Sequence, residues 1–360
     1  MKRIAAFIVL LLLPLPSEAQ EWKAEWDRVV AAAKKEGKVV VCISPGATRR
    51  EFLHTQWTKE FPEIEISISI TRGTSFVPQV VTERAAGTFL WDVYSSGPNT
   101  GAESVRAGIL DPLLPELILP EVKDPEVWGG WDSAFYDRER KYVLGLFSDL
   151  QSPYYDAKKL SPEKAKRLGL KVLMEPELKG KITWYDPRVL GPGAPYLALI
   201  HTVLGDAALK RISVDQEPVF VSNLRDATDA LARSKAVLVF AGNPDEGMRA
   251  YREAGMKFDI RPLGNTPETA YLGTDGATIG VFNKRPHPNA ARLFVNWVMS
   301  KRIGEMLAAT QGYDSRRQDV KPNNPEFAAI RGANYVQAQK DENDELIHRL
   351  QAELKKARPQ

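Results

Sequence analysis

The sequence predicts an α/β protein of two lobes, each a mainly parallel β-sheet flanked by helices, joined by a hinge with a cleft between the lobes. Three observations lead to this prediction. A chain of 360 residues is longer than a single compact core usually accommodates. Its composition, with 43% hydrophobic and 26% charged residues, is typical of a folded protein. Short apolar runs alternate with segments of helical period, as in parallel sheets. The alternation occurs in two blocks, separated by a proline-rich stretch and an extended segment at 142–150.

The N-terminus has the pattern of a secretory signal peptide. Lys2 and Arg3 precede an apolar run at residues 4–13, and small residues follow up to Ala19. A membrane anchor is the alternative, but about 20 apolar residues are needed to span a bilayer. We therefore expect cleavage after Ala19 and an exported, soluble mature protein in the periplasm.

Composition narrows the functional classes. The chain has 49 Lys and Arg against 46 Asp and Glu, and a net charge of +3 argues against a dedicated nucleic-acid-binding protein. Cys42 is the single cysteine, so the chain can form neither an internal disulfide nor a cysteine-rich zinc site. Because it lies in an apolar run, we expect a small core residue.

In the first block, successive strand–turn–helix units indicate a parallel sheet with right-handed crossovers. Thr48 with Glu51 and Thr100 with Glu103 have the spacing of a capping box, which predicts two helix starts. The run at 64–70 alternates apolar and polar residues, as in a strand near a sheet edge. The expected strands are 39–43, 64–70 and 92–95, and the expected helices are 21–35, from 48, 76–86 and from 100.

The second block repeats the alternation, and the chain then returns to the first. Expected strands are 181–184, 219–221, 236–240 and 258–263, with helices at 194–204, 223–233 and from 243. A strand at 276–282 and a helix at 288–300 return the chain to the first block, and a charged helical tail follows at 327–356. The predicted boundaries are 1–19 for the signal peptide, 20–145 plus 265–325 for lobe I, 146–264 for lobe II and 326–360 for the tail.

Polar turns follow the strands of both blocks. Ligands of open parallel sheets bind at the carboxyl ends of strands, where the N–H groups of helix N-termini point. Turns rich in Ser, Thr, Gly and Asn suit an anionic or strongly polar solute. The candidate ligand-binding residues are Ser44, Gly46, Arg72, Thr74, Ser75, Ser96, Arg188, Gly193, Ala194 and Asn243, together with Tyr271 and Asp275, which we expect to line the hinge.

These candidates have structural alternatives. The two arginines either clamp a carboxylate or phosphoryl group or are solvated loop residues. Thr74 and Ser75 either donate hydroxyls to the solute or cap helices, and a capping role is favoured for Asn243. The glycines of the turn at 190–194 favour a backbone contact with the solute over an ordinary helix start.

Signatures of catalysis are weak. Ser161 and Lys164 have the S-x-x-K spacing of penicillin-recognising enzymes, but the companion motifs are absent, and Ser before Pro-Glu is a common helix start. The four histidines are scattered without metal-ligand spacing. We therefore expect no catalytic residue and no cofactor, with a secreted enzyme on a similar scaffold as the alternative.

Four segments carry a resemblance to a known family: EWDRVVAAAKKEGKVVVCIS, WDVYSSG, YVLGLFSDLQSPYYDAKKL and KRPHPNAARLFVNWVMSKRIGEML. In this order they resemble extracellular solute-binding proteins of bacterial ABC importers, in the ferric-iron-binding-like branch of the type II periplasmic binding proteins. The resemblance covers roughly residues 22–320. It implies hinge closure on a small solute, delivery to a membrane permease, and a monomer without a nucleic-acid partner.

The sequence departs from this branch at the metal ligands. The resemblance implies a His, an acidic residue and a Tyr pair in three strand turns, whereas this chain has Ala47 and Thr48, Gly97, and Ala-Gly-Asn at 241–243. Fe(III) requires hard anionic ligands. We therefore expect no metal site and weak or no ferric-iron binding, with a ferric-iron-binding protein of atypical ligands as the alternative.

Overall fold

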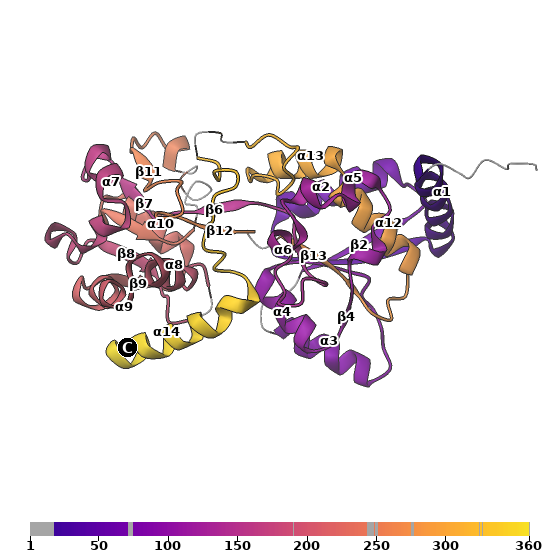
Figure 1. Ribbon diagram of the computed structural model, residues 1–360, viewed down its shortest axis with the longest axis horizontal. Coiled ribbons are helices and arrows are strands. Elements are labelled where there is room, and N and C mark those ends of the chain that lie inside the picture. Colours follow the sequence, from indigo (N-terminus) through magenta and orange to yellow (C-terminus); the bar gives the residue numbers. More distant parts are fainter. Residues whose placement is uncertain are drawn as a thin grey trace, which may run out of the picture.

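The computed structural model describes residues 18–70, 75–189, 191–242, 248, 251–274, 277–323, 325 and 327–359. Within these ranges the chain forms two α/β lobes joined by a ribbon of two strands (Figure 1). The predicted two-lobe α/β fold class is confirmed, whereas both sheets are mixed and not mainly parallel. The predicted signal peptide lies almost entirely outside the described residues, and helix α1 (Glu18–Glu36) already includes the expected cleavage position. No helix in the described ranges is both long and apolar enough to cross a membrane.

Lobe I is built on a six-stranded sheet in the order β2-β1-β3-β13-β4, with β5 paired to β13. β1 runs parallel to β2 and β3, as the strand–turn–helix units predict. β13 runs antiparallel to β3, β4 and β5, so the sheet is mixed. The strands are β1 (Lys38–Ile43), β2 (Glu65–Ile70), β3 (Val93–Ser95), β4 (Leu110–Asp111), β5 (Leu144–Gly145) and β13 (Thr278–Phe282).

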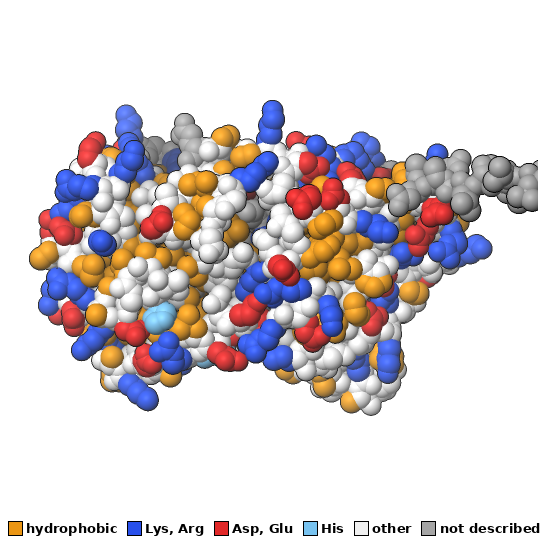
Figure 2. Space-filling model, in the orientation of Figure 1, with side chains coloured by type: hydrophobic (Ala, Val, Ile, Leu, Met, Phe, Trp, Pro, Cys, Tyr) orange, Lys and Arg blue, Asp and Glu red, His pale blue; other side chains and the backbone are white. Residues whose placement is uncertain are grey.

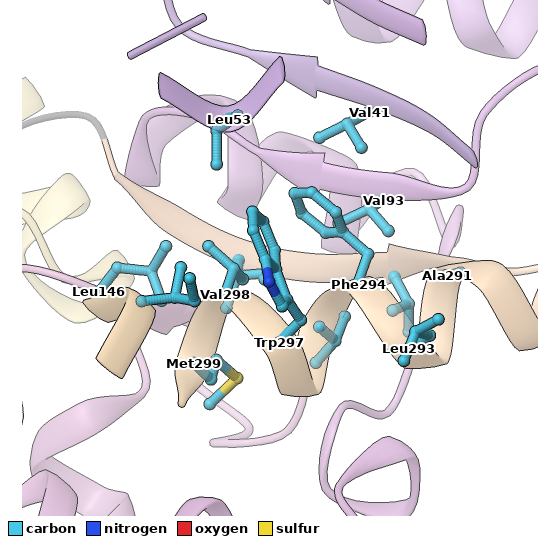
Figure 3. Packing of buried hydrophobic residues seen from close by; sticks show 14 of the residues in the cluster. Val41, Leu53, Val93, Leu146, Ala291, Leu293, Phe294, Trp297, Val298 and Met299 are labelled. Atoms are coloured by element: carbon cyan, nitrogen blue, oxygen red, sulfur yellow. The ribbon is translucent and has the colours of Figure 1, made fainter. Parts of the chain in front are cut away.

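Helices cover both faces of the lobe I sheet, which explains the continuous apolar run of β1. Val41 belongs to the cluster formed with α2 and α12, whereas Cys42 faces α3. Phe294 and Trp297 of α12 point toward the strands (Figure 3), and their rings lie 5.4 and 5.2 Å from that of Trp57. Burial raises the pKa of the Cys42 thiol to about 12, which fits the predicted core role. The helices are α2 (Ala47–Glu60), α3 (Phe76–Ala85), α4 (Pro98–Arg106), α5 (Pro120–Lys123), α6 (Trp131–Ala134), α12 (Pro288–Met299) and α13 (Lys301–Gln311).

Lobe II has a five-stranded sheet in the order β11-β7-β10-β8-β9. β8 runs parallel to β9 and β10, and β7 runs antiparallel to β10 and β11. The strands are β7 (Tyr154–Asp156), β8 (Ile182–Tyr185), β9 (Val219–Val221), β10 (Leu238–Phe240) and β11 (Ile260–Pro262). The helices are α7 (Pro162–Leu168), α8 (Pro195–Leu204), α9 (Asp206–Lys210) and α10 (Leu224–Ala232).

The hinge ribbon consists of β6 (Asp149–Gln151) paired antiparallel with β12 (Tyr271–Gly273). It joins both lobes at the carboxyl ends of their parallel strands. In lobe I, the carbonyl of Ser96 after β3 accepts hydrogen bonds from the N and Oγ1 of Thr278, 2.9 and 2.7 Å away, at the start of β13. In lobe II, Tyr154 pairs with Val239 near the carboxyl end of β10. The carboxyl ends of both sheets therefore face the hinge.

The C-terminal segment is not the separate helical tail that the sequence predicts. It passes between the lobes beside β12, where Tyr271 pairs with Val336, and only α14 (Asp344–Ala357) is a regular α-helix. α14 lies along lobe II (Figure 1), and Ile347, Leu350 and Leu354 belong to the lobe II core. The apolar face of this charged helix thus completes lobe II.

Candidate ligand-binding site

Two serine hydroxyls meet at the carboxyl edge of lobe I. Ser44 follows β1 and Ser96 lies directly after β3, and the strand register brings Ile43 opposite Ser95. The Ser44 and Ser96 Oγ atoms are 2.8 Å apart, so that one hydroxyl donates to the other. Both residues were predicted as ligand contacts, and the structure places them together.

Two helices begin beside this serine pair. α2 begins at Ala47 after Gly46, and α4 begins at Pro98 after Gly97. Among the described residues, no side chain caps either helix start, so the predicted caps at Thr48 and Thr100 are wrong because both helices start earlier. A helix N-terminus carries N–H groups without intrahelical partners and about half a positive charge. Two such ends at one edge favour an anionic group.

Arg49 adds a positive charge to this edge, and the sequence interpretation missed it. Its side chain is 5% exposed, and its guanidinium donates a 2.6 Å hydrogen bond to the Ser95 hydroxyl. The signal was present in the helical period: Arg49 lies three and four residues before Phe52 and Leu53, which are buried on the same face of α2.

The carboxyl edge of lobe II is formed by backbone. After β8, a Cβ on Gly193 would lie 1.8 Å from the Tyr185 carbonyl oxygen, and a Cβ on Gly191 would lie 2.5 Å from the Tyr185 ring. The Trp184 indole donates a 2.9 Å hydrogen bond to the Gly193 carbonyl and fixes the turn. Ala194 is buried and precedes α8. Glycine is therefore required at 191 and 193, because a side chain at either position would clash with Tyr185.

Polar groups lie between the glycine turn at 191–193 and the hinge strand β6. Gly242, after β10, has a φ of +80°, and a Cβ there would lie 3.4 Å from Gln151 Oε1 and 3.9 Å from Pro192 Cβ. The Tyr196 hydroxyl donates to the Ser152 carbonyl at 3.1 Å, and burial, followed by the charge of Asp149, raises the Tyr196 pKa.

Tyr271 lies in the hinge strand β12, where the sequence places it. Its ring is 1% exposed and packs edge-on against Tyr196, with centroids 5.1 Å apart. The ring thus belongs to the lobe II core.

Arg188 is the candidate whose role changes most. Its Nε and one terminal nitrogen donate to both carboxylate oxygens of Asp186 at 2.9 and 2.8 Å, and the other terminal nitrogen donates to the Arg358 carbonyl at 2.8 Å. The guanidinium also lies 5.0 Å from the centre of the Phe220 ring. Burial alone would raise the Asp186 pKa, but the hydrogen bonds from Arg188 outweigh it and hold that pKa below its usual value. The expected clamp on the solute is thus an ion pair within lobe II.

The remaining candidates divide into two groups. Ser75 is exposed and directly precedes α3. Arg72, Thr74, Asn243 and Asp275 lie outside the described residues, so their expected contacts stay predictions.

The residues checked for catalysis have structural roles. The Ser161 hydroxyl accepts a 3.2 Å hydrogen bond from the Lys164 backbone and caps α7, and the Lys164 amine pairs with Glu175 at 2.6 Å. His287 Nδ1 lies 2.8 Å from the fully buried Asp92, which precedes β3 at the edge of the sheet opposite the serine pair. The part of the chain that the structure describes holds no group of three His, Cys, Asp or Glu residues arranged for a metal.

Facing carboxyl edges of two α/β lobes across a hinge define the fold of the type II periplasmic binding proteins. The chain has the two-lobe fold of solved periplasmic binding proteins, ferric-ion-binding proteins among them. It matches iron-bound HitA of Pseudomonas aeruginosa with a TM-score of 0.66 and 15% identity, covering 88% of this chain and 99% of HitA. The apo ferric ion-binding protein A of Pasteurella haemolytica matches with a TM-score of 0.67 and 14% identity, covering 90% and 99% of the two chains.

A neighbour with a different ligand has the same architecture. The periplasmic binding protein AfuA of Actinobacillus pleuropneumoniae, with fructose-6-phosphate bound, matches with a TM-score of 0.59 and 15% identity over 89% of this chain and 99% of AfuA. No protein-family profile and no curated protein sequence matches this chain. At these identities the neighbours establish the fold, and the ligand has to be argued from the residues of this chain.

Proposed function

We propose that the protein is the periplasmic solute-binding component of an ABC importer, which binds an anionic or strongly polar organic solute between its lobes and delivers it to a membrane permease. One observation carries the proposal: the Ser44–Ser96 pair lies between two helix N-termini without side-chain caps in the described chain. Such ends stabilise an anion by backbone hydrogen bonds and by the helix dipole. Arg49 behind the pair strengthens the same preference.

Ferric iron is a poor cargo for this site. The positions at which the family resemblance places iron ligands hold Ala47, Gly97 and Gly242, none of which offers an anionic donor. We expect weak or no specific Fe(III) binding in a titration at neutral pH. A stoichiometric coloured complex with a tyrosinate charge-transfer band would contradict this expectation and support the atypical iron-binding alternative.

Organic phosphates, phosphonates and organic acids are the solute classes that fit. The fructose-6-phosphate bound by AfuA is an example of a phosphorylated solute on the same architecture. Native mass spectrometry of protein purified from its own host tests the proposal, because a tightly bound solute co-purifies and its mass identifies it. A thermal-shift screen of organic acids, phosphonates, sugar phosphates and Fe(III) is the cheaper version. Stabilisation by neutral solutes alone would overturn the anionic assignment.

A secreted enzyme on the same scaffold is the alternative function. The described chain offers two His–Asp pairs that an enzyme could use. His201 pairs with Asp206, whose side chain is largely exposed. In the His287–Asp92 pair, the Asp92 oxygens also accept hydrogen bonds from the Val40 and His287 backbone N–H groups, so the carboxylate joins β1 to the start of α12. A receptor binds its solute saturably and releases it unchanged. Recovery of a chemically altered solute after prolonged incubation would favour the enzyme.

Export is part of the same proposal. Cleavage after Ala19 would leave a mature chain that starts at Gln20 and retains nearly all of α1. Intact-mass measurement on periplasmic protein tests this directly. A mature form that keeps residues 4–13 would contradict the exported, soluble receptor.

A further inference from the structure

Gln151 is a buried polar residue that the fold alone does not account for. It lies in the hinge strand β6, and its side chain is 5% exposed. Its amide nitrogen donates to the Asp149 carboxylate, whereas its Oε1 is buried without a hydrogen-bond partner in the described part of the chain. Burying an acceptor without a hydrogen bond costs free energy, so such a group requires an explanation.

Asp149 fixes the direction in which the free acceptor points. A carboxylate accepts hydrogen bonds and an amide has one donor end and one acceptor end, so the NH2 group of Gln151 must face Asp149. The Oε1 is then directed away from Asp149. Because both residues lie on β6 two positions apart, they share one face of the ribbon.

Gly242 lies close to this acceptor. The Cβ position of Gly242 lies 3.4 Å from Gln151 Oε1, so a larger side chain there would cover the acceptor. Gly242 follows β10 at the carboxyl edge of lobe II, and Pro192 of the glycine turn lies beside it. The acceptor thus lies where the hinge meets the proposed ligand-binding edge.

We propose that Gln151 is a specificity-determining ligand contact, which accepts a hydrogen bond from a hydroxyl or ammonium group of the solute. The proposal rests on the proposed function, because it concerns the same cleft. It divides the solute into two ends: an anionic end for the helix N-termini of lobe I, and a hydrogen-bond donor for the hinge. Asp149 is a positioning residue whose negative charge also favours a donor.

The test uses small anions that differ in the donor alone. Glycerol 3-phosphate carries hydroxyls, 2-aminoethyl phosphate carries an ammonium group, and propyl phosphate has neither; citrate and propane-1,2,3-tricarboxylate form a second set. Calorimetric titration of the full mature chain gives each Kd. We expect the donor-bearing member of at least one set to bind about threefold to tenfold tighter for a hydroxyl, and about tenfold to a hundredfold tighter for an ammonium group.

Two variants assign this preference to Gln151. Gln151→Met keeps the size of the side chain and removes the acceptor, so it should make the members of a set bind equally. Asparagine tolerates a positive φ, so Gly242→Asn should keep the turn while its side chain covers the acceptor. This variant should therefore also make the members of a set bind equally. Gln79→Met, on the exposed surface of α3, is the matched control and should leave every Kd unchanged.

The outcomes separate this inference from the proposed function. Loss of the preference in both variants, with unchanged thermal unfolding, supports it. Equal binding of donor-bearing and donor-free anions to the wild type, or a preference that survives in Gln151→Met, overturns the role of Gln151 and leaves the anion receptor intact. Absence of binding by every anion in both sets overturns the receptor proposal and the role of Gln151 with it.

Discussion

The two lobes have similar architectures but build their facing edges from different groups. Lobe I presents the Ser44 and Ser96 hydroxyls, two helix N-termini and the nearby Arg49. Lobe II presents a backbone turn that Gly193 and the Trp184 indole hold in shape. Under the proposed function, this difference assigns selection by charge to lobe I and selection by shape to lobe II. Substitutions at the lobe I edge should therefore change which solute binds. Substitutions at the lobe II edge should disrupt the conformation of the glycine turn.

The largest effect is expected for Gly193→Ala. The added Cβ would overlap the Tyr185 carbonyl oxygen at 1.8 Å, so the turn must move and the Trp184 hydrogen bond is lost. We expect the free energy of unfolding to fall by about 3 kcal/mol or more. Gly205→Ala is the control: a φ of +84° adds strain, but no atom of the described chain lies within 4 Å of the new Cβ, and a loss of about 1 kcal/mol is expected. Equal losses in urea denaturation would contradict the steric argument.

A change in charge on lobe I should have the next largest effect, and it should act on binding. Arg49→Met removes the buried positive charge behind the serine pair, and we expect the anion that binds most tightly to the wild type in the solute screen to bind about tenfold to a hundredfold more weakly. Arg50→Met, at the adjacent exposed position, should change Kd by less than about twofold. The assignment fails if calorimetry gives the two variants the same Kd, or if Arg49→Met weakens the binding of a neutral solute by the same factor.

Arg188→Ala should change lobe II stability and leave solute affinity unaltered. The Arg188 and Asp186 side chains are 15% and 19% exposed, against 50% and 43% for the similar pair of Arg261 with Asp259. We expect a loss of about 1–2 kcal/mol for Arg188→Ala and less than about 0.5 kcal/mol for Arg261→Ala.

The pH dependence provides the check on this ion pair. The folded pKa of Asp186 is lowered, so its contribution is present above the unfolded pKa of about 4 and is lost as the pH falls through the folded value. The stability difference between wild type and Arg188→Ala, measured by denaturation at pH 7 and pH 3, should therefore shrink at the lower pH. If Arg188→Ala instead weakened solute binding at pH 7 without changing stability, Arg188 would be a ligand contact.

The smallest effect concerns ion pairs that two largely exposed arginines of lobe I form with the C-terminal segment. Arg106 pairs with Asp341 at 2.7 Å, and Arg138 pairs with Glu345 at 3.1 Å; basic and acidic side chains lie interspersed where the two lobes meet (Figure 2). Arg106→Met should change stability by less than about 0.5 kcal/mol at low salt and not measurably at about 1 M salt. A salt-independent loss would show that Arg106 acts through packing.

Local patterns in the sequence predicted most of the fold but not the contacts between distant segments. The apolar runs predicted β1 and β10 because such strands are buried on both faces. The helix starts at Ala47 and Pro98 were missed by one or two residues, because the capping-box spacing also occurs inside a helix. The helix predicted at 327–356 shortened to α14, because residues before it lie beside β12, and no local pattern reveals that pairing.

The residues of the candidate site were likewise predicted only in part from the sequence. Ser44 and Ser96 could be predicted because each follows a strand that the apolar pattern identifies. Arg188 could be placed in its turn but not given its partner, since the Arg358 carbonyl comes from the far end of the chain. Gln151 was missed because a polar residue in an extended segment carries no signal of burial until the Gly242 turn is brought beside it.

The late position of β13 and α14 in the chain has a consequence for the order of synthesis. The lobe I sheet lacks an inner strand until Thr278–Phe282 has emerged, and the lobe II core lacks Leu350 and Leu354 until the last residues follow. Domains generally fold as units, N-terminal ones first. Here neither lobe has its complete core until these last segments are made, so we expect both lobes to complete folding only after synthesis. This order of completion fits the proposed export, in which the chain crosses a membrane before it folds.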